Sequence, residues 1–463
     1  MKRFFAGLLC LLTMGACSLT LSGCTLKTGV DLMQLPKPNK DRQAISDELE
    51  RVHSTDAVED APYEGENRNT VQMVDLDGDG VEEVVAFFRA PANGNTYEAV
   101  VLSKQSDESY TCVGRIQGTG VRIGQVSYPV VTEDGQRCIL MSMDKAGDQG
   151  SHLIAADYSD SGIEVMLETD YISMLTVDLD SDGSQNVFLI SGQENRRTAT
   201  IYSYDEEDCD LTLMSESPLS ASAKIISRVD SGYIADNQPA VFVEETVSGG
   251  SGQQTDLFVY QPEEGLRNLA LSTENGTGRG TYRVVPANAC DINGDGLTEI
   301  PRAVHMVGSM SDGSDAVYML DWYLYDADGD PTYVETTYRN VSQEWDFHIS
   351  QDWYDAVHAV KGSQDGTDYT TFEVYAADGK SIPLLTIYYI LGDESEINAR
   401  VEASDELFAL DATDSGVFVA QIPAEAAGSS LRLTEDQVHE RFSLIVVDWS
   451  ASQSCQEGKA NEA

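Results

Sequence analysis

Short apolar runs separated by Gly, Asp, Asn and Ser turns fill the chain from about residue 66 to about residue 338. Runs of this kind between turn-forming residues predict β-strands. Examples are residues 71–74, 84–88, 174–177 and 187–190. The run at 84–88 is apolar at every position rather than at alternate ones, which is typical of a strand buried on both faces. The pattern therefore predicts a mainly β region.

Three of the predicted turns are acidic loops of nine residues, at 75–83, 178–186 and 291–299. Each has oxygen-bearing side chains at the first, third, fifth and ninth places, glycine at the sixth and a backbone carbonyl at the seventh. A hard cation such as Ca²⁺ requires oxygen ligands of this kind. The predicted ligands are Asp75, Asp77, Asp79, Val81 and Glu83 in the first loop, Asp178, Asp180, Asp182, Ser184 and Asn186 in the second, and Asp291, Asn293, Asp295, Leu297 and Glu299 in the third. We therefore expect up to three Ca²⁺ sites.

The alternative for each loop is a hairpin turn without an ion, because Asp and Gly favour turns for reasons unrelated to metals. Three copies in the same register favour the metal site. An EF-hand is excluded, since its bidentate Glu at the twelfth place is replaced by Ala86, Leu189 and Arg302. The second loop is the weakest candidate because its ninth residue, Asn186, is neutral.

The first-place aspartates lie 103 and then 113 residues apart, about twice the length of a four-stranded propeller blade. Unmarked units should therefore lie between the marked ones. Residues 125–168 and 225–271 are the candidates, because each contains a strand, a turn and a strand at the position in the repeat where the marked units have their acidic loop. Five units of about 50 residues result. A ring of such blades leaves few open sheet edges, which favours a β-propeller-like repeat domain over a long sandwich.

The acidic loops at blade spacing resemble the FG-GAP or VCBS repeats of the integrin-α-type propeller. That resemblance implies Ca²⁺ binding by Asp75, Asp77, Asp79, Glu83 and their counterparts, and it implies no catalytic activity. The whole chain is also similar to lipoproteins of Firmicutes. The middle loop departs from the repeat pattern at Ser181 and Asn186.

Residues 1–23 combine a basic start with an apolar stretch, which is typical of a secretory signal peptide. They end in Leu21-Ser-Gly before Cys24, a pattern that looks like a bacterial lipobox with Cys24 as the lipidated residue. Ordinary cleavage and secretion is the alternative. We expect the mature protein to be lipid-anchored to the cell membrane on its extracytoplasmic face. Residues 24–65 would then hold the anchor, a tether and a short helix at 41–53.

The formal charge of the chain is −49. Loss of residues 1–23 would remove two basic residues and no acid, leaving 27 basic against 78 acidic residues and a charge of −51. We therefore expect neither nucleic acids nor anionic membrane surfaces as partners. Bound Ca²⁺ would relieve part of the repulsion within the fold.

After the repeat domain (66–338), residues 339–450 predict a smaller C-terminal α+β domain, and residues 451–463 a disordered tail. Trp322, Trp345 and Trp353 fall near the junction. Core packing is the simpler interpretation, and a stacking platform for a glycan or protein partner is the alternative.

No catalytic motif stands out in the sequence, so the leading hypothesis is a non-catalytic binding or interaction module at the cell surface. An envelope polysaccharide hydrolase or lyase is the alternative, because aromatic and acidic residues occur together near the junction. A structural envelope protein with no ligand except Ca²⁺ is a third possibility.

Overall fold

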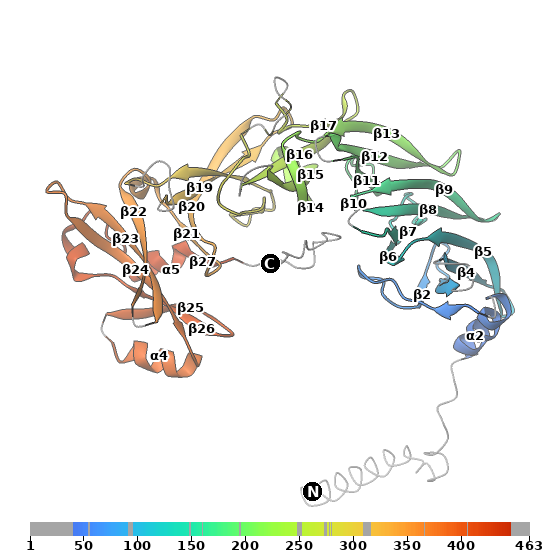
Figure 1. The fold of residues 1–463 in the computed structure, drawn as a ribbon, viewed down its shortest axis with the longest axis horizontal. Helices are drawn as coiled ribbons and strands as arrows, with labels where there is room; N and C mark the ends of the chain where they lie inside the picture. The colour runs from blue at the N-terminus through green and yellow to red at the C-terminus, as the bar shows by residue number, and fades with distance from the viewer. Residues whose placement is uncertain are drawn as a thin grey trace, which may run out of the picture. The chain divides into compact units, whose positions relative to one another are not determined.

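The computed structural model describes residues 40–445, apart from 54–55, 91–95, 148–149, 160, 194–195, 248–251, 273–275, 277, 279, 309–315, 365 and 405. The protein is mainly β, and most of its strands belong to consecutive antiparallel sheets (Figure 1). The predicted signal peptide, Cys24 and the tail at 451–463 lie outside the described residues. Among the described helices, none is both long and apolar enough to span a bilayer.

Four sheets follow one another along the first part of the chain. In the second, third and fourth, sequence neighbours pair with one another, whereas in the first sheet the first two strands both pair antiparallel with the third. The first sheet contains β1 (Val58–Glu59), β2 (Val71–Val74), β3 (Glu83–Ala90), β4 (Thr96–Lys104) and β5 (Tyr110–Thr119). The second contains β6 (Arg122–Ser127), β7 (Ile139–Asp144), β8 (Ser151–Ser159) and β9 (Gly162–Tyr171). The third contains β10 (Ser173–Val177), β11 (Asn186–Ser191), β12 (Thr198–Asp205) and β13 (Asp210–Pro218). The fourth contains β14 (Ala223–Ile234), β15 (Gln238–Val247), β16 (Gln253–Gln261) and β17 (Gly265–Asn268), with the 3₁₀ turn η3 (Ala235–Asn237) between its first two strands.

A fifth sheet follows the third acidic loop. It contains β18 (Ile300–His305), β19 (Tyr318–Tyr325), β20 (Pro331–Asn340), β21 (Trp345–His348) and, from the end of the chain, β27 (Phe442–Leu444). The five predicted repeat units correspond to these five sheets, so the expectation of a propeller-like repeat with four-stranded units is confirmed.

A sixth sheet and several helices make up the C-terminal α+β part. The sheet contains β22 (Val357–Gln364), β23 (Thr367–Tyr375), β24 (Ser381–Leu391), β25 (Leu407–Thr413) and β26 (Gly416–Gln421). The helices are α3 (Gln351–Tyr354), α4 (Glu394–Glu402), η4 (Ala424–Gly428) and α5 (Glu435–Arg441). The boundary predicted between residues 338 and 339 falls inside β20, and β21 continues the fifth sheet to His348.

The hydrophobic core lies between successive sheets. In β11, Val187 and Leu189 share a cluster with Leu140 of the second sheet. Phe188, on the opposite face of β11, shares a cluster with Val241 of the fourth sheet. A strand buried on both faces has apolar residues at consecutive positions, which explains the continuous runs in the sequence. Each such buried side chain stabilises the fold by about 1.5–3 kcal/mol.

The helix α2 (Lys40–Val52) and residues 102–112 form a compact unit of their own. Ile45 and Leu49 are the buried apolar residues of this helix. Glu48 accepts a hydrogen bond from the backbone amide of Cys112 at 3.0 Å. The predicted helix at 41–53 is therefore present and packs on residues far along the chain.

Candidate metal centre

The three acidic loops occupy the same position in the first, third and fifth sheets. The first connects β2 to β3, the second connects β10 to β11, and the third lies in the β-bridge between Cys290 and Glu299 that precedes β18. The fourth and sixth residues of every loop have a positive φ, between 60° and 92°. These residues are Gly78, Gly80, Ser181, Gly183, Gly294 and Gly296. The three loops therefore share one backbone geometry, including at Ser181, where a left-handed conformation costs more than it does for glycine.

The first-place aspartate holds each loop closed. Asp75 accepts hydrogen bonds from the amides of Gly78 at 2.9 Å and Gly80 at 3.0 Å. Asp291 does the same with Gly294 at 2.7 Å and Gly296 at 2.8 Å. These local bonds are sufficient to form the turn.

In the second loop the first-place residue, Asp178, accepts hydrogen bonds from the fifth-place amide of Asp182 and the sixth-place amide of Gly183, both at 3.2 Å. The fifth-place carboxylates of all three loops also accept a local bond, from the amide two residues on. The acidic side chains are therefore oriented by the backbone of their own loops.

The side chain of the ninth residue is buried in every loop and closes the loop on its buried side. Its oxygen accepts a hydrogen bond from the amide of the second-place residue, from Leu76 to Glu83 at 3.1 Å and from Ile292 to Glu299 at 3.1 Å. In the second loop, Asn186 uses its one side-chain oxygen for the equivalent bond. The glutamates keep a second oxygen that an ion can use, whereas Asn186 does not.

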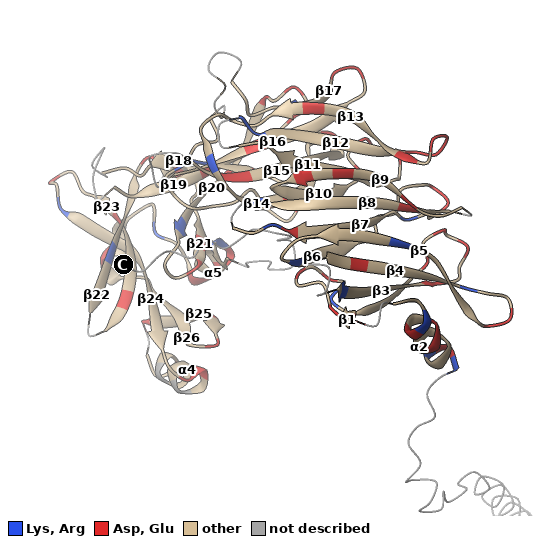
Figure 2. Cartoon of the chain, turned by 45° about the vertical axis from the view of Figure 1, so that its right-hand side comes forward, with Lys and Arg blue, Asp and Glu red and all other residues tan. Residues whose placement is uncertain are grey.

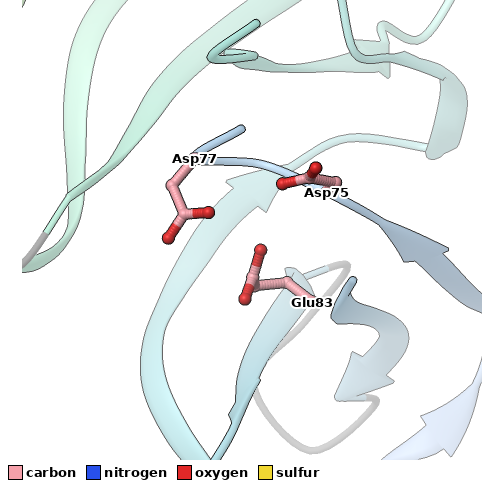
Figure 3. A group of neighbouring side chains, drawn as sticks. All are labelled: Asp75, Asp77 and Glu83. Atoms are coloured by element: carbon pink, nitrogen blue, oxygen red, sulfur yellow. The ribbon is translucent and has the colours of Figure 1, made fainter. Parts of the chain in front are cut away.

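Three carboxylates converge in the first loop. The side chains of Asp75, Asp77 and Glu83 point toward one space, and one ligand oxygen from each lies within 4.8 Å of the others (Figure 3). Asp79, also a predicted ligand, is outside this group.

Asp178, Asp180 and Asp182 form the corresponding group in the second loop. In the third loop Asn293 stands where the other loops have an aspartate, and its amide nitrogen donates to Asp295 at 3.0 Å. Among its described residues the third loop does not form a group of three carboxylates.

Two carboxylate oxygens in the loops are buried without a hydrogen-bond partner. They are Oε1 of Glu299, a residue with 0 % exposure, and Oδ1 of Asp180. A buried acceptor left unsatisfied costs about 1–3 kcal/mol. A bound cation would satisfy both atoms, so the residues present fit Ca²⁺, whose ligands are carboxylate and carbonyl oxygens.

The loops also hold carboxylates that resist ionisation. Burial raises the pKa of Glu83 to about 7, opposed by the hydrogen bond from Leu76 and reinforced by repulsion from Asp77. Burial likewise raises the pKa of Glu299 to about 7. It also raises the pKa of Asp180. A cation in the loop favours the charged form and would lower these pKa values again.

The three tryptophans do not form the predicted ligand platform. Trp322, Trp345 and Trp353 are 0 %, 0 % and 1 % exposed, so none of them offers a ring face to a ligand. Their indole nitrogens donate to partners inside the fold, as Trp322 does to the hydroxyl of Thr337 at 2.9 Å. The burial agrees with the simpler interpretation, core packing, and not with the alternative of a ligand platform.

The sequence interpretation missed one part of each loop. The second-place residues Leu76, Leu179 and Ile292 hold the ninth-place ligand through their amides, although they supply no ligand themselves. Leu76 and Leu179 are buried under their loops. The available signal was an apolar residue after the first aspartate in all three copies.

No family model matches the chain, and no curated protein sequence matches it either. Solved structures with related architecture include an exotype rhamnogalacturonan lyase, YesX, with 12 % identity over 70 % of this chain and 75 % of that one, at a TM-score of 0.25. The β-propeller domain of the trilobed protease from Pyrococcus furiosus has 11 % identity over 69 % of this chain and 89 % of that one, at a TM-score of 0.24. Sqt1 from Saccharomyces cerevisiae has 9 % identity over 79 % and 96 %, at a TM-score of 0.30. At these TM-scores no functional conclusion follows from the likenesses.

Proposed function

We propose that this protein binds Ca²⁺ through its acidic loops and works as a non-catalytic binding or interaction module, lipid-anchored on the extracytoplasmic face of a bacterial membrane. The observation that carries the calcium part is the convergence of three carboxylates in each of the first and second loops. The unsatisfied buried oxygen of Glu299 supports a site in the third.

Calcium would act as a structural ion in this protein. In the first loop the ligands would be Asp75, Asp77, Asp79, Glu83 and the carbonyl of Val81, with the corresponding residues in the other loops. The ion would join the start of each loop to the buried residue at its end, and it would offset part of the acidic charge seen along the turns (Figure 2). Any recognition surface would lie elsewhere on the sheets.

Thermal unfolding of residues 24–463 with and without Ca²⁺ tests the calcium proposal. We expect Ca²⁺ to raise the melting temperature, and the double substitution Asp75→Ala, Asp291→Ala to remove most of that increase. Mg²⁺ at the same concentration should have a smaller effect, because it demands a tighter octahedral site. An unchanged melting temperature at millimolar Ca²⁺ would contradict the proposal.

The membrane location rests on the sequence around Cys24. In cells, Cys24→Ser should abolish incorporation of a labelled fatty acid and release the protein from the membrane fraction. Retention of the label in this variant would contradict lipidation at Cys24.

A glycan or protein partner at the cell surface completes the proposal. Screening immobilised glycans and cross-linking in intact cells would find either one, and the absence of both would favour a purely structural role. The hydrolase or lyase alternative loses part of its support, because the three tryptophans of the aromatic cluster that motivated it are buried.

A further inference from the structure

A turn of the second sheet contacts two of the acidic loops at once. This turn, residues 130–137, belongs to a unit without metal ligands. At one end the amide of Arg137 donates to the carbonyl of Leu76 in the first loop at 2.8 Å. At the other end the carbonyl of Val130 accepts from the amide of Gln185 in the second loop at 2.7 Å. Backbone hydrogen bonds therefore connect loops that lie about a hundred residues apart in sequence.

The turn between these two contacts is closed on itself. Val130 and Arg137 form a β-bridge, and the amide of Val131 donates to the carbonyl of Gln136 at 2.8 Å. The amide of Gln136 also donates to the hydroxyl of Thr132 at 3.1 Å. Val131 and Thr132 are 3 % and 4 % exposed. The two ends of this turn are therefore bonded directly to each other.

The contact with the first loop reaches a predicted ligand through one residue. The amide of Leu76 holds the carboxylate of Glu83, and the carbonyl of Leu76 holds Arg137. The loop also approaches the turn closely at Gly78, where a Cβ atom would lie 2.6 Å from the carbonyl oxygen of Asp134. An ion that fixes Glu83 would thus also fix the position of the turn.

The contact with the second loop sets the direction of a ligand. The amide of Gln185 and the carbonyl of Ser184 belong to one planar peptide group, in which the N–H and C=O bonds point in opposite directions. Because the amide is bonded to Val130, the seventh-place carbonyl of Ser184 is held facing away from the turn.

The third loop has an equivalent contact that involves neither of the others. The amide of Thr298 donates to the carbonyl of Tyr233 in the fourth sheet at 2.8 Å. Gly232 lies against the side chain of Thr298. This arrangement orients the carbonyl of Leu297 in the same way, but it is separate from the turn at 130–137, so the third loop is an internal control.

We propose that the turn at residues 130–137 couples the first and second calcium sites, so that an ion in one raises the affinity of the other while the third site binds independently. The proposal rests on the calcium binding proposed above. Coupling free energies between sites commonly correspond to affinity changes of about fivefold or more, and they are reciprocal.

Calorimetric titration of full-length mature variants with Ca²⁺ tests this proposal. Asp291→Asn leaves the first and second sites, and adding Asp75→Asn or Asp178→Asn leaves one of them. The overall constant of the two-site protein should exceed the product of the two single-site constants by about fivefold or more. In the control, Asp178→Asn leaves the first and third sites, whose overall constant should equal the product measured for those sites alone.

A second variant leaves every ligand in place. Two glycines inserted after Gly135, where nothing lies within 4 Å of the Cβ position, would loosen the turn. In the Asp291→Asn protein this insertion should abolish the excess affinity, and circular dichroism should report an unchanged fold. If the excess survives the insertion, or if the two sites bind independently without it, the coupling is refuted. A native wild-type fold that gives no calcium-dependent heat would instead refute the proposed function itself.

Discussion

The acidic loops and the interior of the fourth sheet both contain buried carboxylates, but they compensate them differently. In the fourth sheet the protein supplies its own compensation. Arg283 is 0 % exposed and forms an ion pair with Glu244, which is 2 % exposed. The guanidinium also donates to the carbonyls of Ala287 and Thr281. The charge of Glu244 is therefore balanced and hydrogen-bonded without any ligand.

The same interior holds two more buried acids. Asp256 accepts from both the amide and the hydroxyl of Ser220 at 2.6 Å, and Glu245 accepts from Gln254 at 2.6 Å. Burial raises the pKa of both acids, and repulsion from Asp256 raises that of Glu245 further. Burial therefore favours the protonated form of Glu245, whose pKa rises to about 9.

The acidic loops have no basic partner of this kind. Among the ion pairs of the described residues, none includes a carboxylate of the three loops. Their local hydrogen bonds come from neutral backbone amides. The comparison shows that the number of carboxylates does not reveal a cation site. What favours one in the loops is the convergence of carboxylates that have no basic partner.

The largest effect is expected from removing the buried guanidinium of Arg283. Arg283→Ala leaves Glu244 buried without its partner, which should lower the free energy of unfolding by about 3–5 kcal/mol. Urea unfolding measures this, and saturating Ca²⁺ should not restore the loss. The control is Arg267→Ala, which breaks the exposed pair with Glu264 and should cost less than about 1 kcal/mol. Equal losses in the two variants would contradict the comparison.

The next largest effect is the stabilisation that bound Ca²⁺ should give. At a free Ca²⁺ concentration of 100 times Kd, one site should add about 2.7 kcal/mol to the free energy of unfolding. The change in unfolding free energy caused by Glu299→Gln should have opposite signs without and with Ca²⁺. Without Ca²⁺ it should stabilise the protein by about 1 kcal/mol, because a neutral amide replaces a buried carboxylate, and with Ca²⁺ it should reduce the gain.

Urea unfolding in EDTA and in Ca²⁺ measures both effects of Glu299→Gln. Asp328→Asn, in an exposed acidic turn between β19 and β20, is the matched control and should change neither value. A Glu299→Gln protein that is destabilised without Ca²⁺ would show that the loop does not require a cation.

The repeat architecture could be predicted from the sequence because the loops mark it. Their spacing located the unmarked units, and the apolar runs at 84–88 and 187–190 correspond to β3 and β11. The sequence also predicted a turn between two strands in the unit at 125–168. It did not predict that this turn contacts two acidic loops, since hydrogen bonds between separate sheets leave no local pattern in a sequence.

The end of the repeat domain and the tryptophans were harder to predict. The fifth sheet includes β27, which comes from the far end of the chain, so no composition change marks its limit. The sequence around Trp345 and Trp353 does not say which ring is covered, because several aromatic residues share one cluster. The pair of Arg283 and Glu244 lies 39 residues apart in a chain with 78 acids, where any single pairing is one among many.

A smaller effect concerns Glu245 of the fourth sheet. Burial raises the pKa of Glu245 to about 9 from an ordinary value of 4.5. Between these values the folded protein keeps a proton that the unfolded chain has lost, so stability falls as pH rises. The slope due to this group is at most about 1.4 kcal/mol per pH unit. Glu245→Gln should flatten the curve of unfolding free energy between pH 5 and 9 by that amount, and an unchanged slope would mean that Glu245 is ionised.

The smallest effect tests whether strain distinguishes the second loop from the others. Ser181 has a φ of 60° where the first and third loops have glycine. Ser181→Gly removes a left-handed strain of about 1 kcal/mol but adds entropy to the unfolded chain, so we expect a net gain of no more than about 0.5 kcal/mol, independent of Ca²⁺. The reverse change, Gly294→Ser, adds the strain without a steric clash, because nothing lies within 4 Å of that Cβ position, and with the entropy change reversed it should cost no more than about 0.5 kcal/mol. If Ser181→Gly also tightened Ca²⁺ binding, backbone strain rather than the neutral Asn186 would be what weakens the second site.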